Sequence, residues 1–301
     1  MTLALHLPGT RPKRAHALRV GDSVTALAQR YAAEMNASAF ATATRQRHLS
    51  RRSYIAFIAT MYPIVVGFNR ALIRSIAKVD HVRNSSFVKS IARQLEEEQS
   101  HNQLWRGMLE VFGVDHSALY DDFEEYIESF SKEELDELTA DVLPAVRRDL
   151  GAGARSRFEN SGFPDAVLAL YHHLYNSASD DSVSYWEHFA SQAGIEMVIY
   201  DVVTTSILPG VLDHPELDRG LASTHWWLEH GQPPKPVARN QTDEEKHLAL
   251  SKMALNRSET ANVLAIPVES RAEDTMRLFA AALIAQNPRD HSFPIERYLK
   301  A

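Results

Sequence analysis

The sequence predicts an all-α protein, and three observations support this prediction. Apolar residues recur at helical spacing from about residue 22 to residue 257, and the alternating pattern of strands is almost absent. The breaks between the apolar segments carry Gly, Pro, Asn or Ser, which end helices. Apolar residues make up 45% of the 301 residues, enough for a substantial core. Long amphipathic helices joined by short loops favour a helical bundle.

The expected helices follow an irregular N-terminal arm over residues 1–20. They cover residues 22–46, 51–79, 84–113, 118–130, 132–150, 163–177, 181–207, 215–230, 242–257 and 270–286. Pro63 lies inside the second helix and is expected to kink it. The proline-rich segment from Gly231 to Pro236 is expected to be a stiff loop. No shift in composition marks a boundary, so we expect residues 21–301 to form a single domain.

The composition excludes several classes of protein. The chain contains no cysteine, which excludes disulfides, thiolate zinc sites, iron–sulfur clusters and a cysteine nucleophile. A cysteine-free chain is compatible with a reducing compartment, and we expect a cytoplasmic protein. The formal net charge of −7 argues against a nucleic-acid partner. No segment approaches about twenty uninterrupted apolar residues, so no membrane span is expected.

An acid interrupts the apolar face of the third expected helix. One stripe of this helix reads Ile91, Leu95, Glu98, Asn102, Trp105, Leu109 and Phe112. His101 follows Glu98 by three residues and is therefore turned only slightly away from it. A carboxylate and an imidazole on one inward face are suited to bind a cation together.

Two later helices carry similar features. The stripe of residues 181–207 contains Trp186, Phe189, Ala193, Glu196, Tyr200, Val203 and Ile207, in which Glu196 is the only acid. On residues 242–257, Asp243 and His247 are four residues apart and share a face with Leu250 and Ala254. Bundle cores bind metals with inward Glu and His side chains from several helices, so the three helices together favour a metal site.

Each signal also has a purely structural interpretation. The run from Glu96 to Glu98 is also typical of a solvated acidic turn, because charged residues usually face water. Glu97 is four residues from His101 and is the alternative ligand on this helix. Glu196 alone is also compatible with a salt-bridged core position, although unpaired buried carboxylates are rare because burial is costly.

The structural interpretation is strongest for Asp243. Thr242 and Glu245 have the spacing of a capping box, with Thr242 as the N-cap and Glu245 at the third helical position. Asp243 in the first turn would then only complement the helix dipole.

With these residues the sequence resembles the haem-oxygenase-like diiron oxidases, which use that helical fold without haem. The resemblance rests on Glu98-x-x-His101, Glu196 and Asp243-x-x-x-His247, and covers approximately residues 50 to 257. It implies that Glu98, His101, Glu196, Asp243 and His247 are iron ligands, with Glu97 as the alternative ligand beside His101.

The resemblance also implies a function. It implies a non-haem, iron-dependent oxidoreductase that holds two irons, uses O2 as co-substrate and draws on an external electron donor. The expected substrate is a small amine or amino acid, which would undergo N-oxygenation or oxidative C–C cleavage in bacterial specialised metabolism, a biosynthetic role. A homodimer is also expected, as in many members of the family.

Two departures from the family pattern stand out. The helix before the Glu-x-x-His helix usually supplies another glutamate, but residues 51–79 contain no Glu or Asp. The spacing from Glu196 to Asp243 is also longer than usual. His188, His225 and His230 are possible replacements for an additional histidine of the family.

Alternative functions remain open at this stage. Haem binding would require a proximal histidine early in the bundle, where His48 lies in a basic segment that is expected to be exposed. A metal-free enzyme of the thiaminase or cofactor-maturation type is the second alternative, and a non-enzymatic helical interaction protein is the third. The expected aromatic lining of a substrate site is Trp105, Tyr62, Tyr185, Trp186 and Tyr200. Arg70 and Arg74 are candidate partners for a substrate carboxylate, although exposed helix positions are more typical of such residues.

Overall fold

The computed structural model describes residues 19–82, 85–145, 162–231, 249, 251–256, 265–289 and 292–300. Within these ranges the chain is helical and contains no strand, apart from one isolated bridge between Val114 and Leu299. The α-helices are α1 (Val20–Ala37), α2 (Ala39–Arg45), α3 (Arg51–Ala77), α4 (Ser85–Val111), α5 (His116–Glu128), α6 (Lys132–Ala145), α7 (Asp165–Tyr171), α8 (Tyr185–Val202), α9 (Leu208–Val211), α10 (Leu221–Gly231) and α13 (Ala265–Ile284). The prediction of an all-α fold is confirmed.

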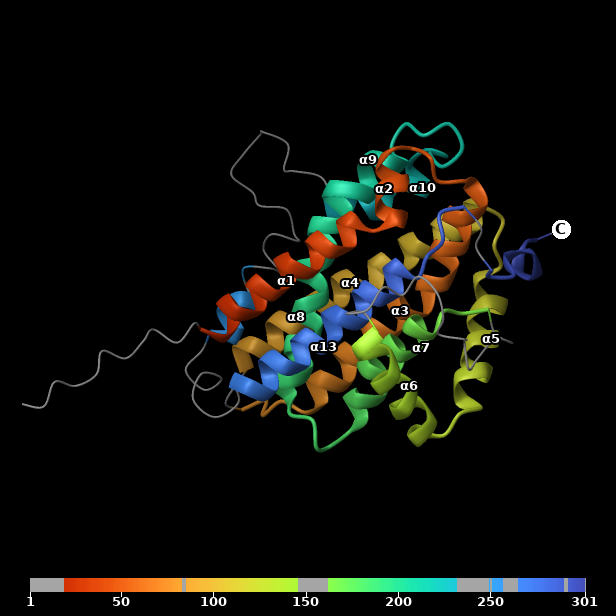
Figure 1. The fold of residues 1–301 in the computed structure, drawn as a ribbon. Helices are drawn as coiled ribbons and strands as arrows, with labels where there is room; N and C mark the ends of the chain where they lie inside the picture. The colour runs from red at the N-terminus through yellow and green to blue at the C-terminus, as the bar shows by residue number, and fades with distance from the viewer. Residues whose placement is uncertain are drawn as a thin grey trace, which may run out of the picture.

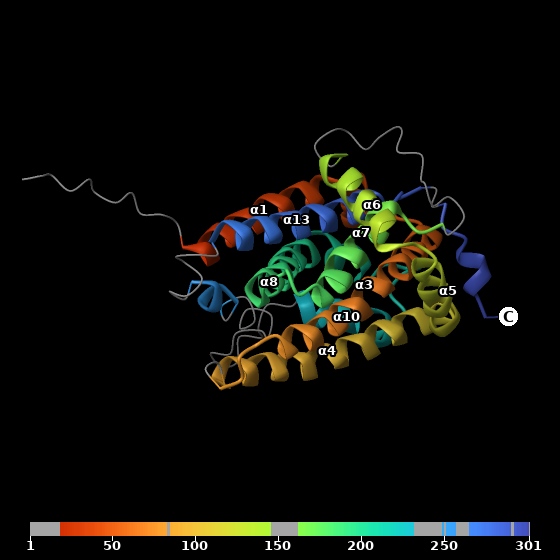
Figure 2. The same cartoon turned by 90° about the horizontal axis from the view of Figure 1, so that it is seen from below.

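The long helices pack as a layered bundle. Helices α1 and α13 lie side by side along one side, and both contact α8 (Figures 1 and 2). Helix α4 lies on the opposite side, where it packs against α3 and α10. Helices α3, α7 and α8 occupy the middle (Figure 2). One cluster of buried hydrophobic side chains extends through these helices from Val20 to Tyr298.

Helix α3 is the central helix of the bundle. The hydroxyl of Ser50 caps its N-terminus by accepting a hydrogen bond from the backbone N–H of Ser53 at 3.1 Å. Pro63 lies inside the helix, as expected. By length and composition, α3 and the helical segment Tyr185–Val211 are apolar enough to span a membrane, but 89% and 61% of their most apolar windows are buried within the fold. A helix that is apolar on all sides is typical of a buried core position.

Three helix boundaries differ from the sequence prediction for local reasons. The expected helix 22–46 is broken at Ser38, whose hydroxyl accepts from Ala41 N at 3.1 Å and starts α2. Helix α8 begins after Ser184 rather than at residue 181, because Ser184 and Glu187 form a capping box. Helix α10 begins only after Gly220, whose positive φ of 81° interrupts the expected helix 215–230.

The segment after α8 changes its helical register. Residues Val203–Ile207 form a π-helical turn, η3, which leads into α9. Pro209 explains part of this change, because it has no backbone N–H to continue the α-helical ladder. At Gly210 the backbone passes α2 so closely that a Cβ atom would lie 2.1 Å from the carbonyl oxygen of Thr44. Only glycine fits this contact without a shift of the backbone.

Candidate functional site

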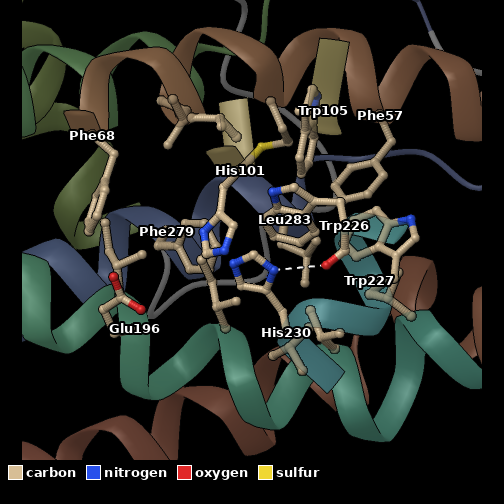
Figure 3. A pocket seen from close by; sticks show the side chains of 18 of the residues that line it. Phe57, Phe68, His101, Trp105, Glu196, Trp226, Trp227, His230, Phe279 and Leu283 are labelled. Atoms are coloured by element: carbon tan, nitrogen blue, oxygen red, sulfur yellow. Dashed lines mark hydrogen bonds between the residues drawn. The ribbon is translucent and has the colours of Figure 1, made fainter. Parts of the chain in front are cut away.

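A mostly apolar pocket lies in the bundle between α3, α4, α8, α10 and α13 (Figure 3). The pocket encloses a cavity of about 80 Å³. One water molecule needs roughly 10–15 Å³, so the cavity has room for a few waters or a small ligand. Its aromatic lining consists of Phe57, Phe68, Trp105, Trp226, Trp227 and Phe279. Its ionisable lining among the described residues consists of Glu98, His101, Glu196 and His230.

The acids that were predicted to interrupt the apolar faces of two helices lie together in this pocket. Glu98 on α4 is buried with 7% exposure, and Glu196 on α8 is buried with 4% exposure. His101 is nearly as well covered, since 12% of its side chain is exposed. The structure therefore places three of the predicted site residues on the wall of one cavity.

Glu98 and His101 form a hydrogen-bonded pair. Nδ1 of His101 and Oε2 of Glu98 are 3.1 Å apart. A carboxylate only accepts hydrogen bonds, so Nδ1 carries the proton and Nε2 carries the lone pair. Asn69 of α3 donates its side-chain amide to the backbone oxygen of Glu98 at 3.0 Å, which joins the two helices at this point. The backbone of α4 is thereby anchored to α3 beside this pair.

His230 of α10 is the fourth ionisable residue of the pocket. Its Nδ1 donates to the backbone oxygen of Trp226 at 2.8 Å, so its Nε2 also carries a lone pair. Its ring stacks on the indole of Trp226 with centroids 3.8 Å apart. The rings of His101 and His230 lie 4.3 Å apart, centroid to centroid (Figure 3). Two imidazoles with the same tautomer therefore meet in one buried space.

The sequence pointed to His230 only as one of three possible replacement ligands. A usable signal was present, because Trp226 and His230 are four residues apart and share one helix face. The other two histidines lie elsewhere. His225 is partly exposed and pairs with Glu229 at 3.0 Å, and the buried His188 does not line the pocket.

Glu196 occupies the α8 side of the pocket. Gln94 of α4 donates its side-chain amide to Oε1 of Glu196 at 3.2 Å, which ties α4 to α8. Beyond Glu196, the π-helical turn η3 presents Val203 and Ile207 to the same cavity. Single π-turns inside helices often occur at functional sites, because they turn side chains away from the regular α-helical direction.

Two of the three tryptophans that line the pocket donate their indole N–H groups to other residues of the protein. Trp105 donates to the backbone oxygen of Ile58 at 2.9 Å, and Trp227 donates to the hydroxyl of Tyr54 at 2.7 Å. Burial raises the pKa of Tyr54 far above its ordinary value, so this hydroxyl stays neutral. The indole nitrogen of Trp226 is buried and has no hydrogen-bond partner among the described residues. Tryptophan N–H groups are normally paired when buried.

Several residues expected near the substrate lie outside this pocket. Of the five aromatic residues expected to line it, only Trp105 does so, and Tyr62, Tyr185, Trp186 and Tyr200 do not. The two arginines make protein contacts elsewhere: Arg70 pairs with Glu124, and Arg74 donates to the hydroxyl of Tyr175 at 2.7 Å. His48 is exposed, as expected for its basic segment.

The described side chains do not by themselves fit a metal centre. Among them, no group of three or more His, Asp or Glu residues is arranged to hold a metal ion. Glu97 pairs with Arg93 at 3.1 Å and does not line the pocket. Helix α3 offers the pocket only apolar side chains, such as Met61 and Phe68, where the family pattern has a glutamate. Asp243, His247 and most of the N-terminal arm lie outside the described residues.

Comparison with known proteins identifies the fold. No protein-family model and no curated protein matches the chain. Among solved structures, the chain is similar to the crystal structure of a TenA homolog from Pseudomonas syringae pv. tomato str. DC3000, with a TM-score of 0.56 and 13% sequence identity. The match covers 89% of this chain and 93% of that chain. The chain therefore has the haem-oxygenase-like all-helical fold.

Proposed function

We propose that this chain is an enzyme of the thiaminase or cofactor-maturation type, which acts by proton transfer on small, largely apolar, nitrogen-containing molecules. The observation that carries the proposal is the buried Glu98–His101 pair on the wall of an apolar pocket. The similarity to a TenA homolog supports this choice at the level of the fold, which the diiron oxidases also share.

In this proposal His101 is the general base. Its Nδ1–H is fixed on Glu98, so Nε2 accepts a proton from the substrate, and the carboxylate stabilises the imidazolium that forms. His230 is a second imidazole beside it. Two adjacent imidazoles disfavour double protonation, so the pair holds one proton at a time and returns it to the substrate. The aromatic walls exclude bulk water from this exchange.

Turnover in the presence of a chelator tests the proposal. The full chain is incubated with EDTA and with thiamine, small amines and nitrogen heterocycles, and products are detected by mass spectrometry. We expect turnover of at least one compound, a rate that falls as acid protonates the imidazoles, and a loss of roughly 100-fold or more in His101→Gln. The matched control is His225→Gln, because His225 lies on the same helix as His230 but outside the pocket, so this variant should keep full activity.

Two results would overturn the proposal. One is turnover that EDTA abolishes and added metal restores. The other is turnover that His101→Gln leaves unchanged in a variant whose helical content and melting temperature match the wild type.

A non-haem iron oxidase that uses O2 is the second candidate, because Glu98, His101 and Glu196 line the same pocket as His230. Carboxylates and imidazoles are suitable iron ligands. Anaerobic titration with ferrous ion, followed by O2 and monitored by visible absorption, tests this candidate. Iron binding that is lost in both His101→Ala and Glu196→Ala would favour the oxidase over the metal-free enzyme.

A further inference from the structure

Some polar atoms of the pocket have hydrogen-bond partners among the described residues, and others do not. Oε2 of Glu98 is engaged by His101, but Oε1 is buried and has no hydrogen-bond partner in the described part of the chain. The buried indole N–H of Trp226 likewise has no hydrogen-bond partner in the described part of the chain. Both side chains line the pocket, with exposures of 7% and 6%. One is an acceptor that carries charge, and the other is a neutral donor.

Buried polar groups without partners are rare, because each has lost its water without gaining a hydrogen bond. A ligand in the pocket would satisfy both atoms at once if it carried a donor for Glu98 and an acceptor for Trp226. The carboxylate favours a positively charged donor, which forms the stronger hydrogen bond. The faces of the surrounding aromatic rings also attract a cation.

The charges of the pocket restrict the ligand further. Glu98 and Glu196 are both carboxylates, and no Lys or Arg lines the cavity among the residues that the structure places. A ligand carboxylate would enter a buried space beside two like charges with no described Lys or Arg to pair with it, which is unfavourable. This argues against free amino acids, which the sequence had left as possible substrates beside amines.

We propose that the ligand of this pocket is a small apolar amine, bound as its cation at Oε1 of Glu98, with a neutral oxygen or nitrogen acceptor that binds the N–H of Trp226. The inference rests on the proposed function only in taking this pocket as the substrate site. The apolar part of the ligand lies among the aromatic and aliphatic side chains that line the pocket. Molecules with a free carboxylate are expected to bind far more weakly.

Three probes that share the same isobutyl side chain test this proposal by calorimetric titration of the full chain. Leucinol carries an amine and a hydroxyl, 3-methylbutylamine has the amine alone, and leucine has a carboxylate in place of the alcohol. We expect leucinol to bind about tenfold more tightly than 3-methylbutylamine, and leucine to show no detectable binding.

Two variants assign the contacts. Trp226→Phe keeps an aromatic ring but removes the N–H, so it should abolish the advantage of leucinol and leave 3-methylbutylamine unchanged. Glu98→Gln should weaken both amines by about tenfold or more. Glu97→Gln is the matched control, because this neighbouring carboxylate lies outside the pocket and should leave all affinities unchanged. Circular dichroism and melting temperature confirm that each variant is folded.

Several outcomes would overturn the inference. They are leucine binding as tightly as leucinol, an unchanged leucinol preference in Trp226→Phe, unchanged affinities in Glu98→Gln, or no leucinol binding at millimolar concentration. Because binding is measured without turnover, the inference and the proposed function fail separately. Probes that bind as expected to an enzyme without metal-free activity would leave the ligand class standing and reject the proposed reaction.

Discussion

Replacing Tyr54 by Phe should destabilise the wall of the pocket by a predictable amount. The hydroxyl of Tyr54 accepts the indole N–H of Trp227 at 2.7 Å, and the two residues are 0% and 2% exposed. The substitution removes only this oxygen and leaves the ring in place, so little packing is lost. The N–H of Trp227 then remains buried without a partner, which costs about 1–3 kcal/mol.

Urea unfolding followed by circular dichroism measures this cost. We expect the free energy of unfolding to fall by about 1–3 kcal/mol with an unchanged m-value, which shows that the unfolded surface is the same. Tyr62→Phe is the control. The hydroxyl of Tyr62 accepts from Arg106 at 2.9 Å, but Arg106 is exposed and regains water, so the cost should stay below about 1 kcal/mol.

A second background separates the hydrogen bond from other effects. In Trp227→Phe the donor is already absent, so adding Tyr54→Phe should cost less than it does in the wild type. Equal costs in the two backgrounds, or a cost below about 0.5 kcal/mol in the wild type, would refute the reasoning that the buried N–H needs this acceptor.

Three further predictions follow from other parts of the molecule. Burial and the neighbouring Arg271 lower the pKa of His173 well below its usual 6.5. The contribution of His173 to the free energy of unfolding is therefore fully present above pH 6.5 and is lost as acid protonates this residue in the unfolded chain. His173→Gln should flatten this loss in urea titrations across pH 4–7. Trp226→Phe should cost about 1 kcal/mol less than Trp105→Phe in unfolding experiments, because only Trp105 loses a hydrogen bond, and equal costs would contradict this. Light scattering should give twice 33.9 kDa for the expected homodimer, and a monomer mass at micromolar concentration would reject it.

The helical fold could be predicted because burial follows the apolar periodicity of the sequence. The same rule found Glu98 and Glu196, since a single acid on an otherwise apolar stripe is visible without a structure. The break at Ser38 was not visible, because apolar spacing continues across it and tertiary packing selects the new helix direction. The π-helical turn η3 was not visible either, because it depends on the missing backbone N–H of Pro209 and on contacts with α2.

The meeting of His101 and His230 could not be predicted from periodicity. Each position is compatible with a helix face, but only the packing of α10 against α4 brings the rings within 4.3 Å. The missing hydrogen-bond partner of Trp226 could not be predicted either. The three pocket tryptophans look alike in the sequence, and only the fold decides which indole N–H groups find an acceptor.

The distribution of polar groups explains how this bundle tolerates its pocket. Four ionisable side chains and one unpaired indole N–H lie on walls contributed by α4, α8 and α10, and each lowers stability when buried. Helix α3 faces them with apolar side chains alone and supplies the packing that offsets this cost. An acid on α3 would complete the pattern of the diiron oxidases, but it would add another buried charge to the cavity. The apolar face of α3 thus leaves Glu98 and Glu196 as the carboxylates that the described part of the chain contributes to the cavity.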